Sequence, residues 1–291
     1  MQNTIERAKR FILQDARPLD YELYRFQIGQ SSKTAVLEAL SAFQNEDGGF
    51  CGPLEPDNFC KKSLAMQSWK AITYLRSVGA FDIKLPMVAE LVHFLTASRR
   101  ADGFWNATDP ETNTYPHAPW WADQGEENRV WGFNPSAEIS GYLLRLGIQA
   151  ESRFAEQLVE QYLASREVSM HELAGLAALY RDMQSLNWPN LPAFREKISN
   201  DLDKLLAKKP EEWESYGLRL SMFSESFAPE LLEPYHDLIR LEQDYLVKTQ
   251  LEDGSWKLNW DWEGNYPETW PLAKQWWKSI AAIQNIRFLG L

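Results

Sequence analysis

The sequence predicts an all-α protein with an (α/α)6 toroid architecture, in which six helical hairpins form an inner and an outer ring. Three observations predict this fold. A short turn motif recurs along the chain, and helices with one apolar face alternate with helices that are apolar on every side. The chain of 291 residues is long enough to bury a sizeable core. We therefore expect a single toroid domain over residues 1–291.

The recurring motif begins with Gln or Arg, passes through a turn that contains Asp-Gly, and ends with an aromatic residue. Its copies run from Gln44 to Phe50, from Arg99 to Trp105 and from Gln250 to Trp256. The closing aromatics are 55 and then 151 positions apart, so the second gap is close to three times the first. Because Asp-Gly breaks a helix, each copy should follow the end of one.

Two kinds of helix alternate between these turns. The segment behind Pro86 has an apolar face with Val88, Leu91 and Leu95, which is typical of an outer helix. Segments 139–146 and 173–179 are apolar nearly all round, which indicates burial as inner helices. We also expect Asp57 and Asn58 to cap the second inner helix. Pairing outer with inner helices predicts hairpins at about 3–28, 31–79, 86–147, 151–185, 192–225 and 233–290.

Composition excludes several classes of function. The net charge is −11, and no cluster of Lys and Arg is present, so no nucleic-acid partner is expected. No apolar run is long enough for a transmembrane segment, and the polar N-terminus does not resemble a signal peptide. The two cysteines, Cys51 and Cys60, form neither a disulfide framework nor a metal-binding pattern. We expect a cytoplasmic protein without a metal or other cofactor.

The repeated motif resembles the QW motif of squalene–hopene cyclases and related toroids. One copy matches fully, one has Phe for Trp, and one has Arg for Gln. The matching positions are Gln250, Gly254 and Trp256; Gln44, Gly48 and Phe50; and Arg99, Gly103 and Trp105. The resemblance implies that these residues are structural and tie neighbouring helices together. It also implies the fold shared by terpenoid cyclases and protein prenyltransferases, with an isoprenoid or other hydrophobic small molecule in a central aromatic cavity.

The chemical signatures of that superfamily are absent from the sequence. No Asp-x-Asp-Asp acid and no Asp-Asp-x-x-Asp element occurs, and neither cysteine has an Asp at the spacing of the prenyltransferase zinc ligands. The nearest acidic run, Asp201-Leu-Asp203, is followed by Lys204 on a predicted outer helix. The resemblance therefore implies a fold, whereas the reaction, if there is one, stays open.

Aromatic residues concentrate around two long loops, at 108–135 and at 257–269. Ten of the 13 Trp residues lie within 105–131 and 256–277. Loops of this length are usually functional or disordered, and their aromatic content argues against disorder. We interpret both as a rim or lid over one end of the cavity. Together with aromatics of the inner helices, they supply the candidate substrate-binding residues Trp69, His117, Trp120, Trp121, Trp131, Tyr142 and Trp276.

Polar residues on the apolar helices are the candidate catalytic groups. Glu138 and Glu172 lie near helix starts, and His171 precedes Glu172. A carboxyl buried in an apolar cavity has a raised pKa and can act as a general acid, and His171 could act as a base. The alternative is a Glu that accepts hydrogen bonds from backbone amides at a helix start, and a His that is an ordinary core residue.

Three functions are compatible with these observations. The first is a cyclase-like or prenyltransferase-like protein that binds a hydrophobic small molecule. The second is a carbohydrate-active (α/α)6 enzyme, a glycosidase or lyase, which requires paired carboxyls and stacking Trp in an open groove. The third is a non-catalytic toroid scaffold, whose centre would be filled by side chains such as Met66, Trp69 or Tyr142.

Overall fold

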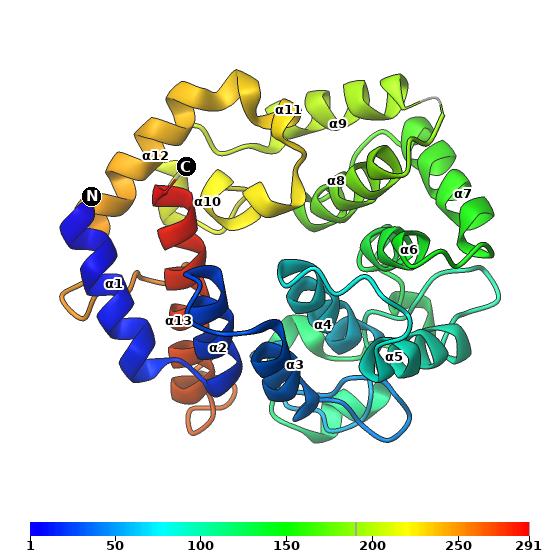
Figure 1. Cartoon of the computed structure of the whole chain (residues 1–291), viewed down its shortest axis with the longest axis horizontal. Helices are drawn as coiled ribbons and strands as arrows, with labels where there is room; N and C mark the ends of the chain where they lie inside the picture. Colours follow the sequence, from blue (N-terminus) through cyan, green and yellow to red (C-terminus); the bar gives the residue numbers. More distant parts are fainter. Residues whose placement is uncertain (190, 291) are drawn as a thin grey trace. The chain divides into compact units, whose positions relative to one another are not determined.

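The computed structural model describes residues 1–189 and 191–290, and every regular element within them is a helix (Figure 1). The predicted all-α class is confirmed. The chain forms two compact units. Unit 1 comprises Met1–Leu40, Leu206–Glu225 and Leu232–Leu291, and unit 2 comprises Ser41–Leu205 and Ser226–Leu231. The single domain over residues 1–291 stays a prediction, and its positions 190 and 291 lie outside the described residues.

Unit 2 is built from two adjacent rows of helices. The first row consists of α4 (Ala65–Ser77), α6 (Ser136–Arg145) and α8 (Met170–Ser185). The second row consists of α5 (Pro86–Ala97), α7 (Glu151–Ala164) and α9 (Pro192–Leu205). Helix α6 packs against both α4 and α8, and α5, α7 and α9 contact α4, α6 and α8 respectively (Figure 1).

The hydrophobic patterns explain these rows. Helix α5 buries Val88, Leu91 and Leu95 on one side and leaves its other side exposed. In contrast, every residue of α6 from Ser136 to Leu144 is buried, as is α8 from Leu173 to Tyr180. The apolar helices form the first row and the amphipathic helices the second. This is because a helix without a polar face can be buried on every side, whereas an amphipathic helix keeps its polar face in water.

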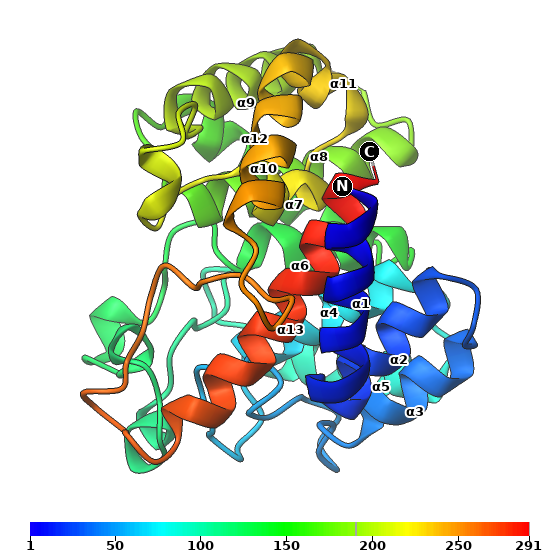
Figure 2. The same cartoon turned by 90° about the vertical axis from the view of Figure 1, so that its left-hand side faces the viewer.

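Unit 1 is organised around its longest helix, α13 (Trp270–Leu289). Figure 2 shows α1 lying beside α13, and the two helices pack together. Three further helices of the unit contact α13. Besides α13, the helices of unit 1 are α1 (Gln2–Asp15), α2 (Pro18–Gln27), α10 (Leu220–Phe223) and α12 (His236–Thr249). Two helices lie at boundaries between the units: α3 (Lys33–Ser41) at Leu40, and α11 (Pro229–Leu232) at Leu232.

The predicted hairpin ranges each contain two helices, although α10 has only four residues. The prediction that Asp57 and Asn58 cap the second inner helix is wrong, since α4 begins at Ala65. The two residues instead fix a loop. The carbonyl oxygen of Asp57 accepts a hydrogen bond from Ala118 at 2.8 Å, and the side chain of Asn58 accepts one from the backbone of Cys60 at 3.0 Å.

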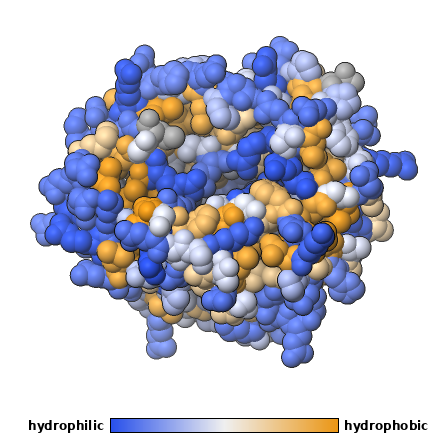
Figure 3. All heavy atoms as spheres, viewed as in Figure 1, coloured by the Kyte–Doolittle hydropathy of each residue, from blue (hydrophilic) through white to orange (hydrophobic). Residues whose placement is uncertain are grey.

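The surface of the molecule carries many hydrophilic residues, as the fraction of charged residues in the sequence leads one to expect. On the face shown in Figure 3, hydrophilic residues are spread among smaller hydrophobic areas, as expected when charged residues make up 24% of the chain. Among residues 1–189 and 191–290, no helix combines the length and the apolar character needed to cross a bilayer.

Candidate functional site: a repeated helix joint, a buried charge cluster and an aromatic loop

The repeated motif adopts one geometry in all three copies. In each, the side chain of the first residue donates to the carbonyl oxygen of the motif glycine and also reaches the first turn of another helix. The contacts are Gln44 with Gly48 and Met87 (3.0 and 3.0 Å), Arg99 with Gly103 and the Glu151 carboxylate (2.8 and 2.5 Å), and Gln250 with Gly254 and Thr4 (2.9 and 2.9 Å). The motif therefore joins the turn after α3 to α5, the turn after α5 to α7, and the turn after α12 to α1.

The glycines of the motif are required by both conformation and space. Gly48, Gly103 and Gly254 have φ values of +85°, +92° and +91°, a region that L-residues with a Cβ rarely adopt. A Cβ on Gly48 would lie 2.2 Å from the Glu90 carbonyl oxygen, and a Cβ on Gly254 would lie 2.4 Å from that of Arg7. These turns consequently lie directly against the backbone of the next helix.

The closing aromatics anchor each turn in the core. Phe50, Trp105 and Trp256 are all buried. The indole Nε1 of each Trp donates to the last turns of the preceding helix, Trp105 to the Leu95 carbonyl at 2.8 Å and Trp256 to the Leu246 carbonyl at 2.9 Å. The sequence repeat is thus a repeat of structure, and its residues have packing roles.

A buried charge cluster lies between α4, α6 and α8. Arg76 of α4 makes a bidentate pair with Asp182 of α8, with N–O distances of 2.8 and 2.6 Å. Its Nε lies 3.3 Å from an oxygen of Glu138, and its side chain is 8% exposed. Burial by itself lowers the pKa of Arg76, but the charge and hydrogen bonds of Asp182 outweigh burial and raise it. Gly141 of α6 leaves the space that Asp182 occupies.

Glu138, the first candidate acid, is therefore part of an ion-paired network. Its other oxygen accepts a hydrogen bond from Nε1 of Trp69 at 2.7 Å. The carboxylate is held by one cation and one indole donor, which fixes the plane of the half-buried Trp69 ring. This arrangement suits positioning of an aromatic surface better than donation of a proton.

Tyr142 lies in the same unit but is fully buried. Its hydroxyl donates to the carbonyl oxygen of Ala80 at 2.5 Å, and its ring lies under the guanidinium of Arg76 at 5.5 Å. Burial raises the pKa of Tyr142. The structure therefore places Tyr142 in the core beneath the charge cluster, where it supports Arg76.

Glu172 and His171 open α8. Glu172 forms a capping box with Ser169, in which the Ser169 hydroxyl and the Glu172 carboxylate each accept a backbone N–H. The second carboxylate oxygen accepts the N–H of Phe133 at 3.1 Å. Both oxygens of Glu172 therefore have structural partners. His171 is half-buried, and burial lowers its pKa.

The first long loop contains three short 3-10 turns, at Pro110–Thr114, Pro119–Trp121 and Glu126–Asn128. Trp121 is buried and stacks on Trp131, with ring centroids 5.2 Å apart. Trp120 is 42% exposed, although it is the immediate neighbour of Trp121. The three predicted Trp residues of this loop thus differ in burial: Trp121 is buried, Trp131 is half-buried and Trp120 is exposed.

His117 is buried at the edge of the same loop. Its Nδ1 is 2.7 Å from the carbonyl oxygen of Tyr115, and its backbone forms an isolated bridge with Asn58. The bridge fastens this loop, residues 108–135 and named here the aromatic loop, to the loop that precedes α4.

The second long loop and Trp276 belong to unit 1. Trp262 is buried against Trp270, and Trp260 meets Trp277 edge to face at a centroid distance of 5.4 Å. The guanidinium of Arg17 lies 5.7 Å from the centroid of the Trp276 ring. The interpretation of both loops as one rim or lid stays a prediction, as does a ligand contact for Trp276.

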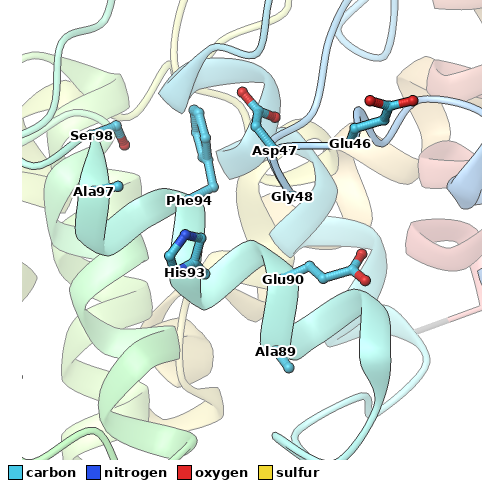
Figure 4. Close-up of a pocket in the computed structure, with 9 residues that line it drawn as sticks. All are labelled: Glu46, Asp47, Gly48, Ala89, Glu90, His93, Phe94, Ala97 and Ser98. Carbon is cyan, nitrogen blue, oxygen red and sulfur yellow. The ribbon is translucent and has the colours of Figure 1, made fainter.

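Two pockets stand out in unit 2. The larger, about 590 Å³, lies between the first motif turn and the exposed side of α5, away from all the predicted catalytic residues (Figure 4). Figure 4 shows Phe94 of α5 beside Asp47 of the turn. The smaller pocket, about 290 Å³, is lined by Trp120 and Trp131 of the aromatic loop. Only the smaller pocket contains predicted binding residues.

The sequence analysis missed Arg76 and Asp182 as a charged pair. A basic residue near a helix C-terminus is usually explained by the helix dipole, so the pattern around Arg76 carries no sign of a partner 106 residues away. Within the described part of the chain, no group of three or more His, Cys, Asp or Glu side chains has the geometry to hold a metal ion.

No protein-family model and no curated protein matches this chain.

Proposed function

We propose that the chain is an α/α toroid of the terpenoid-cyclase type that binds a hydrophobic small molecule, such as an isoprenoid, against the helices α4, α6 and α8. The repeated joint carries this proposal. Three copies of the motif join the turn after one amphipathic helix to the first turn of another in the same way. One of them joins the turn after α12 to the N-terminal helix α1. A joint that links the last hairpin to the first is the linkage a closed ring needs.

The binding surface in this proposal centres on Trp69. Its indole is half-buried and held by the carboxylate of Glu138 at 2.7 Å, so its ring is presented in a fixed orientation. A fixed aromatic ring offers a large apolar area to a hydrophobic ligand at little entropic cost, and its face also stabilises a cation.

The charge cluster argues for binding rather than for hydrolysis of sugars in this region. A glycosidase needs two carboxyls that act separately as acid and base or nucleophile. Here Glu138 and Asp182 contact the same guanidinium, that of Arg76. Asp182 also lies 3.8 Å from Arg145, and Glu138 also accepts a hydrogen bond from Trp69. Both carboxylates are therefore engaged by structural partners, and neither is set apart as a free acid.

The test is ligand-induced stabilisation. We expect the melting temperature to rise on addition of at least one of squalene or geranyl, farnesyl and geranylgeranyl diphosphate. Trp69→Ala should abolish this rise, whereas Trp120→Ala, which changes an exposed tryptophan of the same unit, should keep it. Mass spectrometry of the same mixtures reports any product.

Two results would overturn the proposal. One is the absence of both stabilisation and product with all four compounds. The other is a crystal structure in which the two units form separate bodies, which would remove the ring while leaving the helix joints in place.

A further inference from the structure

In the aromatic loop of unit 2, Trp120 is exposed to solvent while its neighbour Trp121 is buried. Trp120 and Trp121 lie in the 3-10 turn Pro119–Trp121, where successive side chains point in directions about 120° apart. Trp121 therefore points into the core and stacks on Trp131, while Trp120 is 42% exposed. Its ring borders the pocket of about 290 Å³.

The rest of that pocket is lined largely by polar side chains. Gln124, Glu127 and Asn128 are all exposed and line it together with the two indoles. Among the described residues, the side chains of Gln124 and Glu127 accept or donate no hydrogen bond. The pocket thus combines one open indole face with amide donors, amide acceptors and a carboxylate acceptor.

Hydrogen bonds and an ion pair connect the parts of this loop to one another. The carboxylate of Asp123 forms a bidentate pair with Arg129 at 2.7 and 3.0 Å and accepts a hydrogen bond from Thr108 at 3.1 Å. The amide of Asn113 both donates to and accepts from the backbone of Asp123, at 3.0 and 2.8 Å. A binding surface that is already ordered loses little conformational entropy when a ligand arrives.

We propose that this pocket is a saccharide-binding site, an assignment independent of the hydrophobic site at Trp69. The apolar C–H face of one sugar ring stacks on Trp120, and its hydroxyl groups bond with Gln124, Glu127 and Asn128. The volume is near the lower limit of small-molecule sites, about 300 Å³, which suits a single ring of an oligosaccharide.

The same geometry disfavours other ligands. A purely hydrophobic compound would cover the polar side chains of Gln124, Glu127 and Asn128 without offering them any hydrogen bond. A quaternary ammonium ion needs several open aromatic faces around it. Here two aromatic residues, Trp120 and Trp131, line the pocket, and Trp121 covers one face of the second.

The experiment is saturation-transfer NMR followed by calorimetric titration with cellopentaose, chitopentaose and maltopentaose. We expect at least one of them to bind, with saturation transfer strongest at the C–H protons of a single ring. Trp120→Ala should weaken binding by about tenfold or more, and Asn128→Ala should weaken it less. Both substitutions lie at exposed positions, so the variants should keep the parent's melting temperature. Trp69→Ala is the matched control and should bind the saccharide as the parent does.

The proposal is overturned if none of the three saccharides binds, or if Trp120→Ala binds as tightly as the parent. Binding of choline in place of any saccharide would also overturn it and would identify a cation site. Because Trp69→Ala and Trp120→Ala are measured with both ligand sets, failure here and failure of the hydrophobic site are distinguishable.

Discussion

At the scale of single residues, Arg76 of α4 pairs with the two buried carboxylates Glu138 of α6 and Asp182 of α8. Replacing it with Met leaves Asp182 and Glu138 buried without their shared cation. Breaking a buried pair in this way costs about 3–5 kcal/mol. We therefore expect Arg76→Met to lower the free energy of unfolding by that amount, as measured by urea denaturation.

The control for this substitution is Arg100→Met, because Arg100 pairs with the exposed Asp102. Exposed ion pairs contribute about 0–1 kcal/mol, so this variant should unfold almost like the parent. Equal losses for Arg76→Met and Arg100→Met would contradict the central role of the buried cluster.

Asp201 makes the stability of unit 2 dependent on acid. Burial tends to raise its pKa, but hydrogen bonds from Tyr162, Lys197 and Lys204 outweigh burial and lower it. The ionised form is thus favoured in the folded state. The contribution of ionised Asp201 to the free energy of unfolding is complete above the pKa of Asp in the unfolded chain, about 4. It is lost as the pH falls through the lowered pKa of Asp201 in the folded state.

We expect Asp201→Asn to reduce the slope of unfolding free energy against pH below about pH 4, measured by denaturant titration at successive pH values. Tyr162→Phe removes one of the three donors and should give an intermediate slope. A slope identical to that of the parent in Asp201→Asn would show that another group controls this range.

The partner of an individual side chain can be read from the sequence only where that partner is local. The capping box of Glu172 is readable from its distance to Ser169, since both ends lie within one helical turn. The pairing of Arg76 with Asp182 is not readable, because it depends on how two distant helices pack. The opposite exposures of Trp120 and Trp121 depend on a 3-10 turn that no sequence pattern predicts.

At the scale of elements, the motif turns join helices through glycine. Gly254→Ala would place a Cβ 2.4 Å from the Arg7 carbonyl oxygen at a φ of +91°. The left-handed conformation costs about 1–2 kcal/mol and the overlap about 1–3 kcal/mol more, so we expect a loss of about 2–5 kcal/mol by urea denaturation. Gly264 lies in an exposed loop, and a Cβ added to it would have no atom within 4 Å. Gly264→Ala should therefore leave the free energy of unfolding nearly unchanged. A neutral Gly254→Ala would mean that the turn moves away from α1 at little cost.

The helices themselves were largely predictable, and the reason is periodicity. An apolar stripe such as that of Val88, Leu91 and Leu95 has one favourable solution, a helix with that side buried. The three turns were equally predictable because each combines Asp-Gly with an aromatic anchor. The short α10 and the start of α4 were not, since neither has a strong cap or a long stripe.

At the scale of the whole molecule, both ends of the chain belong to unit 1. Helix α1 packs along α13, and Gln250 bonds to Thr4, so the N-terminal helix is fixed to the C-terminal hairpin by tertiary contacts (Figure 2). Chain connectivity is therefore not what holds α1 in place. A permuted chain that begins elsewhere should form the same contacts, because such changes are tolerated at exposed loops.

We expect a circular permutant to fold when a flexible Gly-Ser linker joins the original ends and the new ends lie between Arg166 and Glu167. That site is exposed and lies between α7 and α8. Its circular dichroism spectrum and cooperative melting should match those of the parent. A truncation that removes residues 1–16 should instead lose cooperative unfolding, because it strips α13 of α1 and leaves Gln250 without Thr4. If the truncated chain melts like the parent while the permutant fails to fold, the contacts of α1 contribute little, and the joint at Gln250 has no part in closing a ring.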